Sequence, residues 1–372
     1  MRTEGDFIKI NEWLLPISSI YGLGVRLRNV LFDTKVLKSR SFPLPVIAVG
    51  NITVGGTGKT PHVEYLIRLL RKTAKVAVLS RGYKRKSHGY LLASKKTPMR
   101  MVGDEPFQMK HKFADIHVAV DKDRCHGISR LMEDQATRDV GVVLLDDAYQ
   151  HRYVKPGLNI LLVDYHRLTI YDRLLPAGRL REPHEGASRA DIVIITKCPK
   201  DLKPMEYRVL EKAMGLYPFQ QLFFSTLEYG DLQPVFHGKP RQLSAADKNA
   251  HVLLLTGIAS PQQMMTDLRP SCKHITPMVF ADHHFFTEED TRRINEAFAA
   301  LPSPKLIITT EKDSVRLLEA KGLSSDVRKN LYALPIKVKF LLDGEDKFDK
   351  TIIEYVRENT RNSSVAESTH DH

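Results

Sequence analysis

The sequence of 372 residues predicts an α/β protein in which a parallel sheet with crossover helices is followed by a second, smaller α/β domain. The length exceeds the roughly 250 to 300 residues at which a single hydrophobic core usually stops growing. From residue 42 onward, short runs that are apolar on both faces alternate with helical patterns, as expected of buried parallel strands. The strands expected in the first domain are 45–50, 75–80, 115–120, 140–147, 158–164 and 190–197.

The N-terminal segment, residues 1–35, is expected to contain an apolar helix. Residues 13–25 read WLLPISSIYGLGV without a charge, and Arg26 and Arg28 follow. This stretch is shorter than the about 20 residues that a helix needs to cross a bilayer. Two interpretations remain open: the helix lies in a membrane interface, or it packs on the protein's own core.

The remaining chain divides at a less regular stretch, 218–245, which is rich in turn residues and is expected to be a short ribbon linker. A second α/β pattern follows, with apolar runs in 251–259, 305–318 and 331–342. The expected organisation is therefore a helix in 1–35, a first domain in 36–222, a second domain in 223–360 and a polar, disordered tail in 361–372.

The composition restricts the partners. Lys and Arg number 56 against 44 Asp and Glu, which gives a net charge of +12 and favours a polyanionic partner: nucleic acid, an anionic membrane or a phosphorylated substrate. The three cysteines lack the C-x-x-C spacing of a zinc or redox site, so a reducing cytoplasm is expected. Charge alone does not distinguish among the three kinds of partner.

A glycine-rich loop follows the first expected strand and precedes a helix. It resembles the Walker A pattern G-x-x-x-x-G-K-[ST], except that Thr53 stands where the first glycine is usual. In this pattern backbone N–H groups surround phosphate oxygens, the lysine reaches the β- and γ-phosphates, and the last hydroxyl binds Mg²⁺. The pattern predicts a P-loop NTPase-like domain whose phosphate-binding residues are Thr53, Val54, Gly55, Gly56, Thr57, Gly58, Lys59 and Thr60.

Two adjacent carboxylates, Asp146 and Asp147, end another apolar strand. P-loop enzymes commonly hold Mg²⁺ with such a residue, although an aspartate here could also cap the next element. The base-selecting motif N-K-x-D of GTPases is absent, so ATP is expected rather than GTP.

Asp104, in the segment VGDEP, is a further candidate acid. It could cap a helix, or it could orient or deprotonate an acceptor hydroxyl. The basic run 81–100 could be a solvated loop, a nucleic-acid patch or a site for an anionic acceptor.

Seven segments together resemble one family, the tetraacyldisaccharide 4'-kinases, which are the lipid A 4'-kinases of Gram-negative bacteria. In chain order they are VGNITVGGTGKTP, SRGYKRKS, VGDEP, LLDDAYQHR, LLPAGRLREP, ADHHFF and TTEKDSVRL. The resemblance covers most of the chain, and the loop without the first Walker glycine is the family's form. Ala148 and Tyr149 depart from it, because the family more often has Gly and Phe there.

The resemblance implies that ATP, with Mg²⁺, donates its γ-phosphate to the 4'-hydroxyl of a tetraacylated lipid A disaccharide 1-phosphate. It also implies a peripheral, monotopic location on the cytoplasmic face of the inner membrane, docked through the N-terminal helix. We expect a monomer without a nucleic-acid partner.

The resemblance also assigns roles to residues. Lys59 and Thr60 would serve phosphate and Mg²⁺, and Asp146 and Asp147 the metal. Asp104 would be the catalytic base, paired with His283 of ADHHFF, although His284 remains an alternative. The positions implied near the acceptor are Arg81, Glu105, Gln150, His151, Arg181 and Glu182.

Two alternatives belong to other classes of protein. A P-loop ATPase or GTPase that acts as a switch or chaperone would transfer phosphate only to water. A nucleic-acid-binding protein would show steeply salt-dependent affinity, but no recognition motif supports it.

Overall fold

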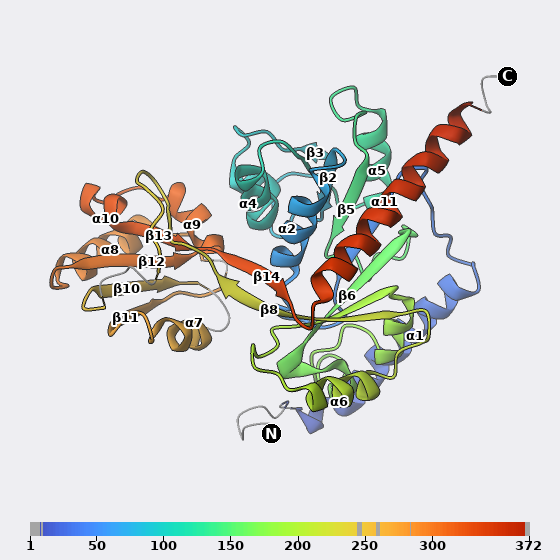
Figure 1. Cartoon of the computed structure of the whole chain (residues 1–372), viewed down its shortest axis with the longest axis horizontal. Helices are drawn as coiled ribbons and strands as arrows, with labels where there is room; N and C mark the ends of the chain where they lie inside the picture. The colour runs from blue at the N-terminus through green and yellow to red at the C-terminus, as the bar shows by residue number, and fades with distance from the viewer. Residues whose placement is uncertain (1–7, 9, 244–247, 258–260, 283, 369–372) are drawn as a thin grey trace. The chain divides into compact units, whose positions relative to one another are not determined.

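The computed structural model describes residues 8, 10–243, 248–257, 261–282 and 284–368, and the chain forms two compact units (Figure 1). The first unit comprises Met1–Val102, Met109–Leu227 and Val338–His372, and the second comprises Gly103–Gln108 and Glu228–Lys337. The short segment that carries Asp104 therefore groups with the second unit, although the sequence places it inside the expected first domain.

The first unit is built on a mostly parallel sheet, which confirms the predicted fold class. Its strand order is β14-β8-β7-β6-β1-β5-β2-β4-β3, with β3 antiparallel to β4. Every strand expected in this unit is present and is shorter than expected by at most two residues at an end. The bounds are β1 Val46–Gly50, β2 Val76–Ser80, β3 Leu91–Leu92, β4 His117–Val120, β5 Val142–Asp146, β6 Leu158–Asp164, β7 Ile192–Thr196, β8 Gln221–Tyr229 and β14 Ile336–Phe340.

Helices cover this sheet and enclose two clusters of buried side chains. One cluster joins β6 and β7 to α6, and the other joins β1, β2 and β5 to α5. Helix α5 begins where the Asp123 carboxylate accepts hydrogen bonds from the N–H groups of Cys125 and His126. The helices that carry residues of this unit are α1 Leu15–Asp33, α2 Lys59–Leu70, α3 Met99–Val102, α4 Asp104–Lys112, α5 Arg124–Glu133, α6 Pro204–Met214 and α11 Gly344–Ser368.

The C-terminal helix α11 differs from the sequence prediction in two ways. It returns to the first unit, where Tyr355 Oη donates to the Val46 carbonyl at 3.2 Å and the Phe348 ring meets Phe223 at 5.3 Å. It also continues to Ser368, whereas the sequence predicts a disordered tail from residue 361, and 369–372 lie outside the described residues. No glycine or proline interrupts the chain after Gly344, so nothing local ends the helix there.

The N-terminal helix α1, preceded by a 3₁₀ turn at Glu12–Leu14, has two different faces. On one face, Ser18 Oγ donates to the Leu174 carbonyl at 2.7 Å and Phe32 is buried. The other face is exposed and apolar. Its large side chains include Ile17, Ile20, Leu23, Leu27 and Val30, and Trp13 of the preceding turn is also exposed. None of the described helices is long and apolar enough to cross a membrane.

The second unit has a smaller sheet of order β11-β10-β12-β13-β9, parallel except at β9. The expected apolar run 331–342 splits at Pro335, which cannot donate a backbone hydrogen bond, so that β13 and β14 enter different sheets. The chain passes between the units within α4, β8 and β14. The bounds are β9 Gln233–Pro234, β10 His251–Thr256, β11 His274–Val279, β12 Lys305–Thr310, β13 Leu331–Leu334, α7 Pro261–Leu268, α8 Glu288–Ala299, α9 Glu311–Leu318 and α10 Ser325–Asn330.

Candidate active site

The phosphate loop is held from inside by Asn51. This fully buried residue donates from Nδ2 to Thr57 Oγ1 at 2.9 Å and to Thr53 Oγ1 at 3.3 Å. The positions in a left-handed conformation are Gly55, with φ of 115°, and Gly58, with φ of 83°. Thr53 instead makes an extended bridge, so no glycine is required there, and its hydroxyl helps to close the loop. This accounts for the variant Walker pattern.

A second segment, residues 179–181, pairs antiparallel with the loop. Val54 N–H donates to the Arg179 carbonyl at 2.8 Å, and Arg181 N–H donates to the Ile52 carbonyl at 2.7 Å. Leu180, opposite Thr53, is buried in the core. The motif GRLREP is thereby fixed to the phosphate loop by its backbone.

The paired aspartates stand at the end of β5, directly beside β1. Asp146 lies opposite Val49 in the parallel register and accepts a hydrogen bond from Ser80 Oγ at 3.1 Å. Asp147 has φ of 48° and lies 3.4 Å from both Lys59 Nζ and Arg181 Nη1. Burial raises the pKa of Asp147, but the Lys59 ammonium and the Arg181 guanidinium lower it by more. The pKa of Asp147 is therefore below its ordinary value.

Gln150 and Glu182 link the start of the phosphate loop to the GRLREP segment. Gln150 Nε2 donates to the Asn51 carbonyl at 2.5 Å and to Glu182 Oε1 at 3.1 Å, while Arg189 Nη2 donates to Glu182 Oε2 at 2.8 Å. Because Glu182 is 3% exposed and already bonded twice, its present role is to position Gln150 and the loop.

His151 lies near three arginines and the carboxylate of Asp123. Burial lowers the pKa of His151 to about 4, and the charges of Arg124, Arg28 and Arg81 act in the same direction. Its buried Nε2 makes no hydrogen bond within the described part of the chain. A neutral imidazole surrounded by arginines is suited to an anionic or hydroxyl-bearing ligand.

Sequence reasoning missed Arg124, which is 2% exposed at the start of α5. Its guanidinium donates to the carbonyls of Asp121 at 3.1 Å and Asp146 at 3.4 Å. Burial lowers its pKa to about 10. An arginine three residues after the strand-end acid Asp121 was the available signal, but its burial depends on residues distant in the sequence.

In the second unit, Asp104 lies in the first turn of α4. Its Oδ2 accepts from Arg316 Nε at 3.2 Å and also contacts Arg316 Nη2. Arg316 in turn donates from Nη1 to Asp313 Oδ1 at 2.8 Å, and both of these side chains are fully buried. The motif TTEKDSVRL contains this aspartate and arginine, which sequence reasoning did not assign.

The histidine partner predicted for Asp104 is not visible in these contacts. His283 lies outside the described residues. His284 Nε2 hydrogen bonds to Asp290 Oδ2 at 2.8 Å, and its ring stacks on Phe280. Glu105 follows Asp104 in α4 and is partly exposed.

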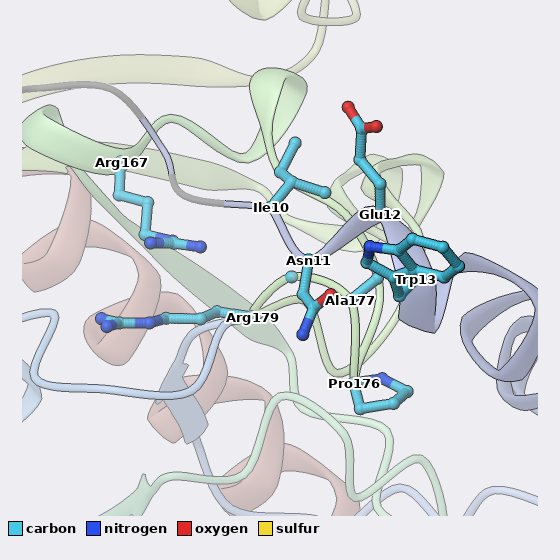
Figure 2. Close-up of a pocket in the computed structure, with 9 residues that line it drawn as sticks. Ile10, Asn11, Glu12, Trp13, Arg167, Pro176, Ala177 and Arg179 are labelled. Carbon is cyan, nitrogen blue, oxygen red and sulfur yellow. The ribbon is translucent and has the colours of Figure 1, made fainter.

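A cavity of about 570 Å³ opens beside the start of the N-terminal helix in the first unit. Asn11, Trp13 and Ala177 line it together with Arg167 and Arg179. Figure 2 shows both arginine side chains extended, but in different directions.

A glycine-rich loop between β1 and α2, with carboxylates at the end of the adjacent strand, defines a P-loop nucleotide-binding protein. A family model described as tetraacyldisaccharide-1-P 4'-kinase matches residues 10–357. The chain belongs to this family.

Similar proteins and a solved structure support this family membership. The chain is 59% identical to a tetraacyldisaccharide 4'-kinase of Phocaeicola vulgatus, over 98% of this chain and all of the relative. It is 52% identical to one of Bacteroides thetaiotaomicron, over 99% of both. The "apo" form of LpxK from Aquifex aeolicus in complex with ATP matches with a TM-score of 0.72 and 31% identity, covering 93% of this chain and 99% of that one.

The lowered pKa of His151 predicts a pH dependence of stability. Between pH 6.5, the ordinary histidine value, and the folded value of about 4, the unfolded chain takes up a proton that the folded chain does not. The free energy of unfolding should therefore fall as the pH is lowered from 6.5 to about 4. Above pH 6.5 His151 should make no pH-dependent contribution to it. Imidazole NMR of the folded protein should show the His151 resonance titrating near pH 4, with His151→Gln identifying it. A midpoint near 6.5 would contradict the buried, arginine-surrounded site.

Proposed function

We propose that this protein transfers the γ-phosphate of ATP to the 4'-hydroxyl of a tetraacyldisaccharide 1-phosphate in lipid A biosynthesis. The observation that carries the proposal is the cluster of Lys59, Asp147 and Arg181 at the phosphate loop, in a chain similar to tetraacyldisaccharide 4'-kinases over its full length. A cationic cluster of this kind suits the charge that a transferring phosphoryl group carries.

ATP binding follows from the loop geometry. Backbone N–H groups of residues 53–60 and the N-terminus of α2 would receive the phosphates. Asp147 holds Lys59 and Arg181 beside the loop, and these cations would turn to the phosphate oxygens when the nucleotide binds. Asp147 thus keeps both side chains in place before binding.

The residues also fit Mg²⁺. Asp146 is 1% exposed at a strand end, accepts a hydrogen bond from Ser80 Oγ, and lies beside the strand that leads into the loop. Asp146, Thr60 and Asp147 offer the hard oxygen ligands that this ion prefers, and bound Mg²⁺ would neutralise charge on the β- and γ-phosphates.

Asp104 is proposed as the base that accepts the acceptor hydroxyl proton. Its ion pair with Arg316 fixes the carboxylate direction, and Asp313 fixes Arg316. His283 remains the second member of the dyad that the family resemblance implies. Arg81, Glu105, Gln150 and His151 are proposed to contact the acceptor, whose phosphate accounts for the basic surroundings of His151.

The exposed face of α1 is proposed to dock on the cytoplasmic surface of the inner membrane. Ile20 is 73% exposed and Leu23 70%, and Trp13 in the preceding 3₁₀ turn is 93% exposed. This exposure is unfavourable in water but suited to the headgroup boundary of a bilayer. The opposite face packs on the rest of the first unit, so the docking proposal concerns the exposed face alone. A monomer would suffice for this arrangement.

Incubation with radiolabelled ATP, Mg²⁺ and the lipid disaccharide 1-phosphate in detergent should yield a doubly phosphorylated lipid. Lys59→Ala should lower kcat/KM by about 100-fold or more, because it removes a cation at the transferring group. Lys350→Ala, on the exposed side of α11, is the matched control. ATP hydrolysis at an equal rate with and without lipid, and no lipid product, would instead indicate a P-loop switch or chaperone.

The variant Asp104→Asn distinguishes a role of Asp104 as the catalytic base from a purely structural role. Asparagine keeps the size and hydrogen-bonding oxygen of the side chain, so the start of α4 should persist, but it cannot take up the proton. We expect kcat to fall by about 10² to 10⁴ while ATP affinity is retained. Asp115→Asn, which alters an exposed ion pair with Arg71, serves as control. Near-normal turnover of Asp104→Asn would exclude this base.

Charges placed on the exposed face of α1 should weaken membrane binding. Ile20→Asp with Leu23→Asp should reduce co-flotation with phosphatidylglycerol-containing vesicles at least about tenfold, since burying each side chain contributes about 1.5 to 3 kcal/mol. Leu342→Asp adds a charge at an exposed apolar position of the same unit outside α1 and should leave flotation unchanged. Equal flotation of the double variant and the wild type would contradict docking through α1.

A further inference from the structure

Arg179 has a rigid backbone position but an uncommitted side chain. Its N–H donates to the buried Asp172 carboxylate at 3.1 Å, and its carbonyl accepts from Val54 N–H at 2.8 Å. The guanidinium is exposed and, among the residues that the structure describes, makes no hydrogen bond or ion pair. Arg167 beside it differs, because Asp172 already binds its guanidinium at 2.6 and 3.0 Å.

The Arg179 side chain lies over the phosphate loop. A methyl group placed on Gly55 would be 4.0 Å from Arg179 Nη1, with no other atom as near. Gly55 is the third position of the eight-residue phosphate-binding pattern, and its φ of 115° turns the loop at this point. In Figure 2 the Arg179 side chain is extended rather than folded back on its own segment. A cation is therefore presented where the loop receives the terminal phosphates.

The pairing of the two segments explains why Arg179 and Arg181 act on one site. In an extended segment, residues i and i+2 share a face, so Leu180 enters the core while the two arginines point the opposite way. Arg181 reaches Asp147, which also contacts Lys59. Arg179 adds a second guanidinium, two residues along, to the face that carries Lys59 and Arg181.

We propose that Arg179 is an arginine finger supplied by the same chain, which donates hydrogen bonds to oxygens of the γ-phosphoryl group during transfer. This inference extends the proposed kinase reaction. The bond from the γ-phosphorus to the β–γ bridging oxygen breaks as the bond to the acceptor 4'-oxygen forms. The hydroxyl proton passes to the base, ADP leaves, and Arg179 stays protonated throughout. Its guanidinium stabilises the charge on the transferring group at the transition state.

A transition-state contact has a distinct kinetic signature. Arg179→Ala should lower kcat by about 10³ or more, as for other arginine fingers, while the equilibrium Kd for ATP changes less than about threefold. Arg179→Lys should recover only part of the loss, because an ammonium lacks the planar fork of a guanidinium. Added methylguanidine should restore part of the Arg179→Ala activity. Arg173→Ala, an exposed arginine of the same turn, should behave as wild type.

The same assay contains the results that would overturn the proposal. A kcat for Arg179→Ala within about threefold of wild type would exclude a finger. A raised KM for the lipid with unchanged kcat would place Arg179 on the acceptor phosphate, and weaker ATP binding with unchanged kcat would make it a ground-state contact; either refutes the proposal. Melting curves of each variant identify misfolding. If Arg179→Ala misfolds, the activity of Arg179→Lys and the rescue by methylguanidine decide whether Arg179 acts as a finger. An inactive wild type would refute the kinase function itself, separately from Arg179.

Discussion

The backbone pairing between the phosphate loop and residues 179–181 is the interaction on which the site depends. Two hydrogen bonds, from Val54 to Arg179 and from Arg181 to Ile52, set the register of the pairing. A slip of one residue would turn Leu180 outward and bury the arginines, since side chains alternate along an extended segment. The same register lets Thr53 replace the usual glycine, because the bridge holds it in an extended conformation. The conformation of the variant loop therefore depends on its pairing with the GRLREP segment.

Charge is organised differently in the two units. In the first unit, Lys59 and Arg181 face a single carboxylate, Asp147, and Arg124 and Arg81 surround His151, so the balance is positive where ATP and a phosphorylated lipid would bind. In the second unit, the buried Arg316 lies between Asp104 and Asp313, so the charges are closely matched. Lys59, Arg81, Arg124 and Arg181 are among the residues that give the chain its net charge of +12.

Features set by local pattern could be predicted from the sequence. Buried parallel strands are apolar on both faces, and the loop and strand-end aspartates follow directly from them, so these elements and the fold class were confirmed. Contacts between distant residues were not predictable in this way. Examples are the return of α11 to β1, the burial of Arg124, and the pairing of Asp104 with Arg316, 212 positions later. Each depends on how elements pack, which no local period encodes.

The most direct test of the two-arginine site is a crystal structure with MgADP and tetrafluoroaluminate, which mimics the transferring phosphoryl group. The pairing of segment 179–181 with the loop predicts that Lys59, Arg181 and Arg179 all donate to the fluorides or to the bridging oxygen, with the Val54–Arg179 and Arg181–Ile52 hydrogen bonds intact. A complex in which Lys59 and Arg181 bind the fluoroaluminate while Arg179 remains directed into solvent would contradict the account.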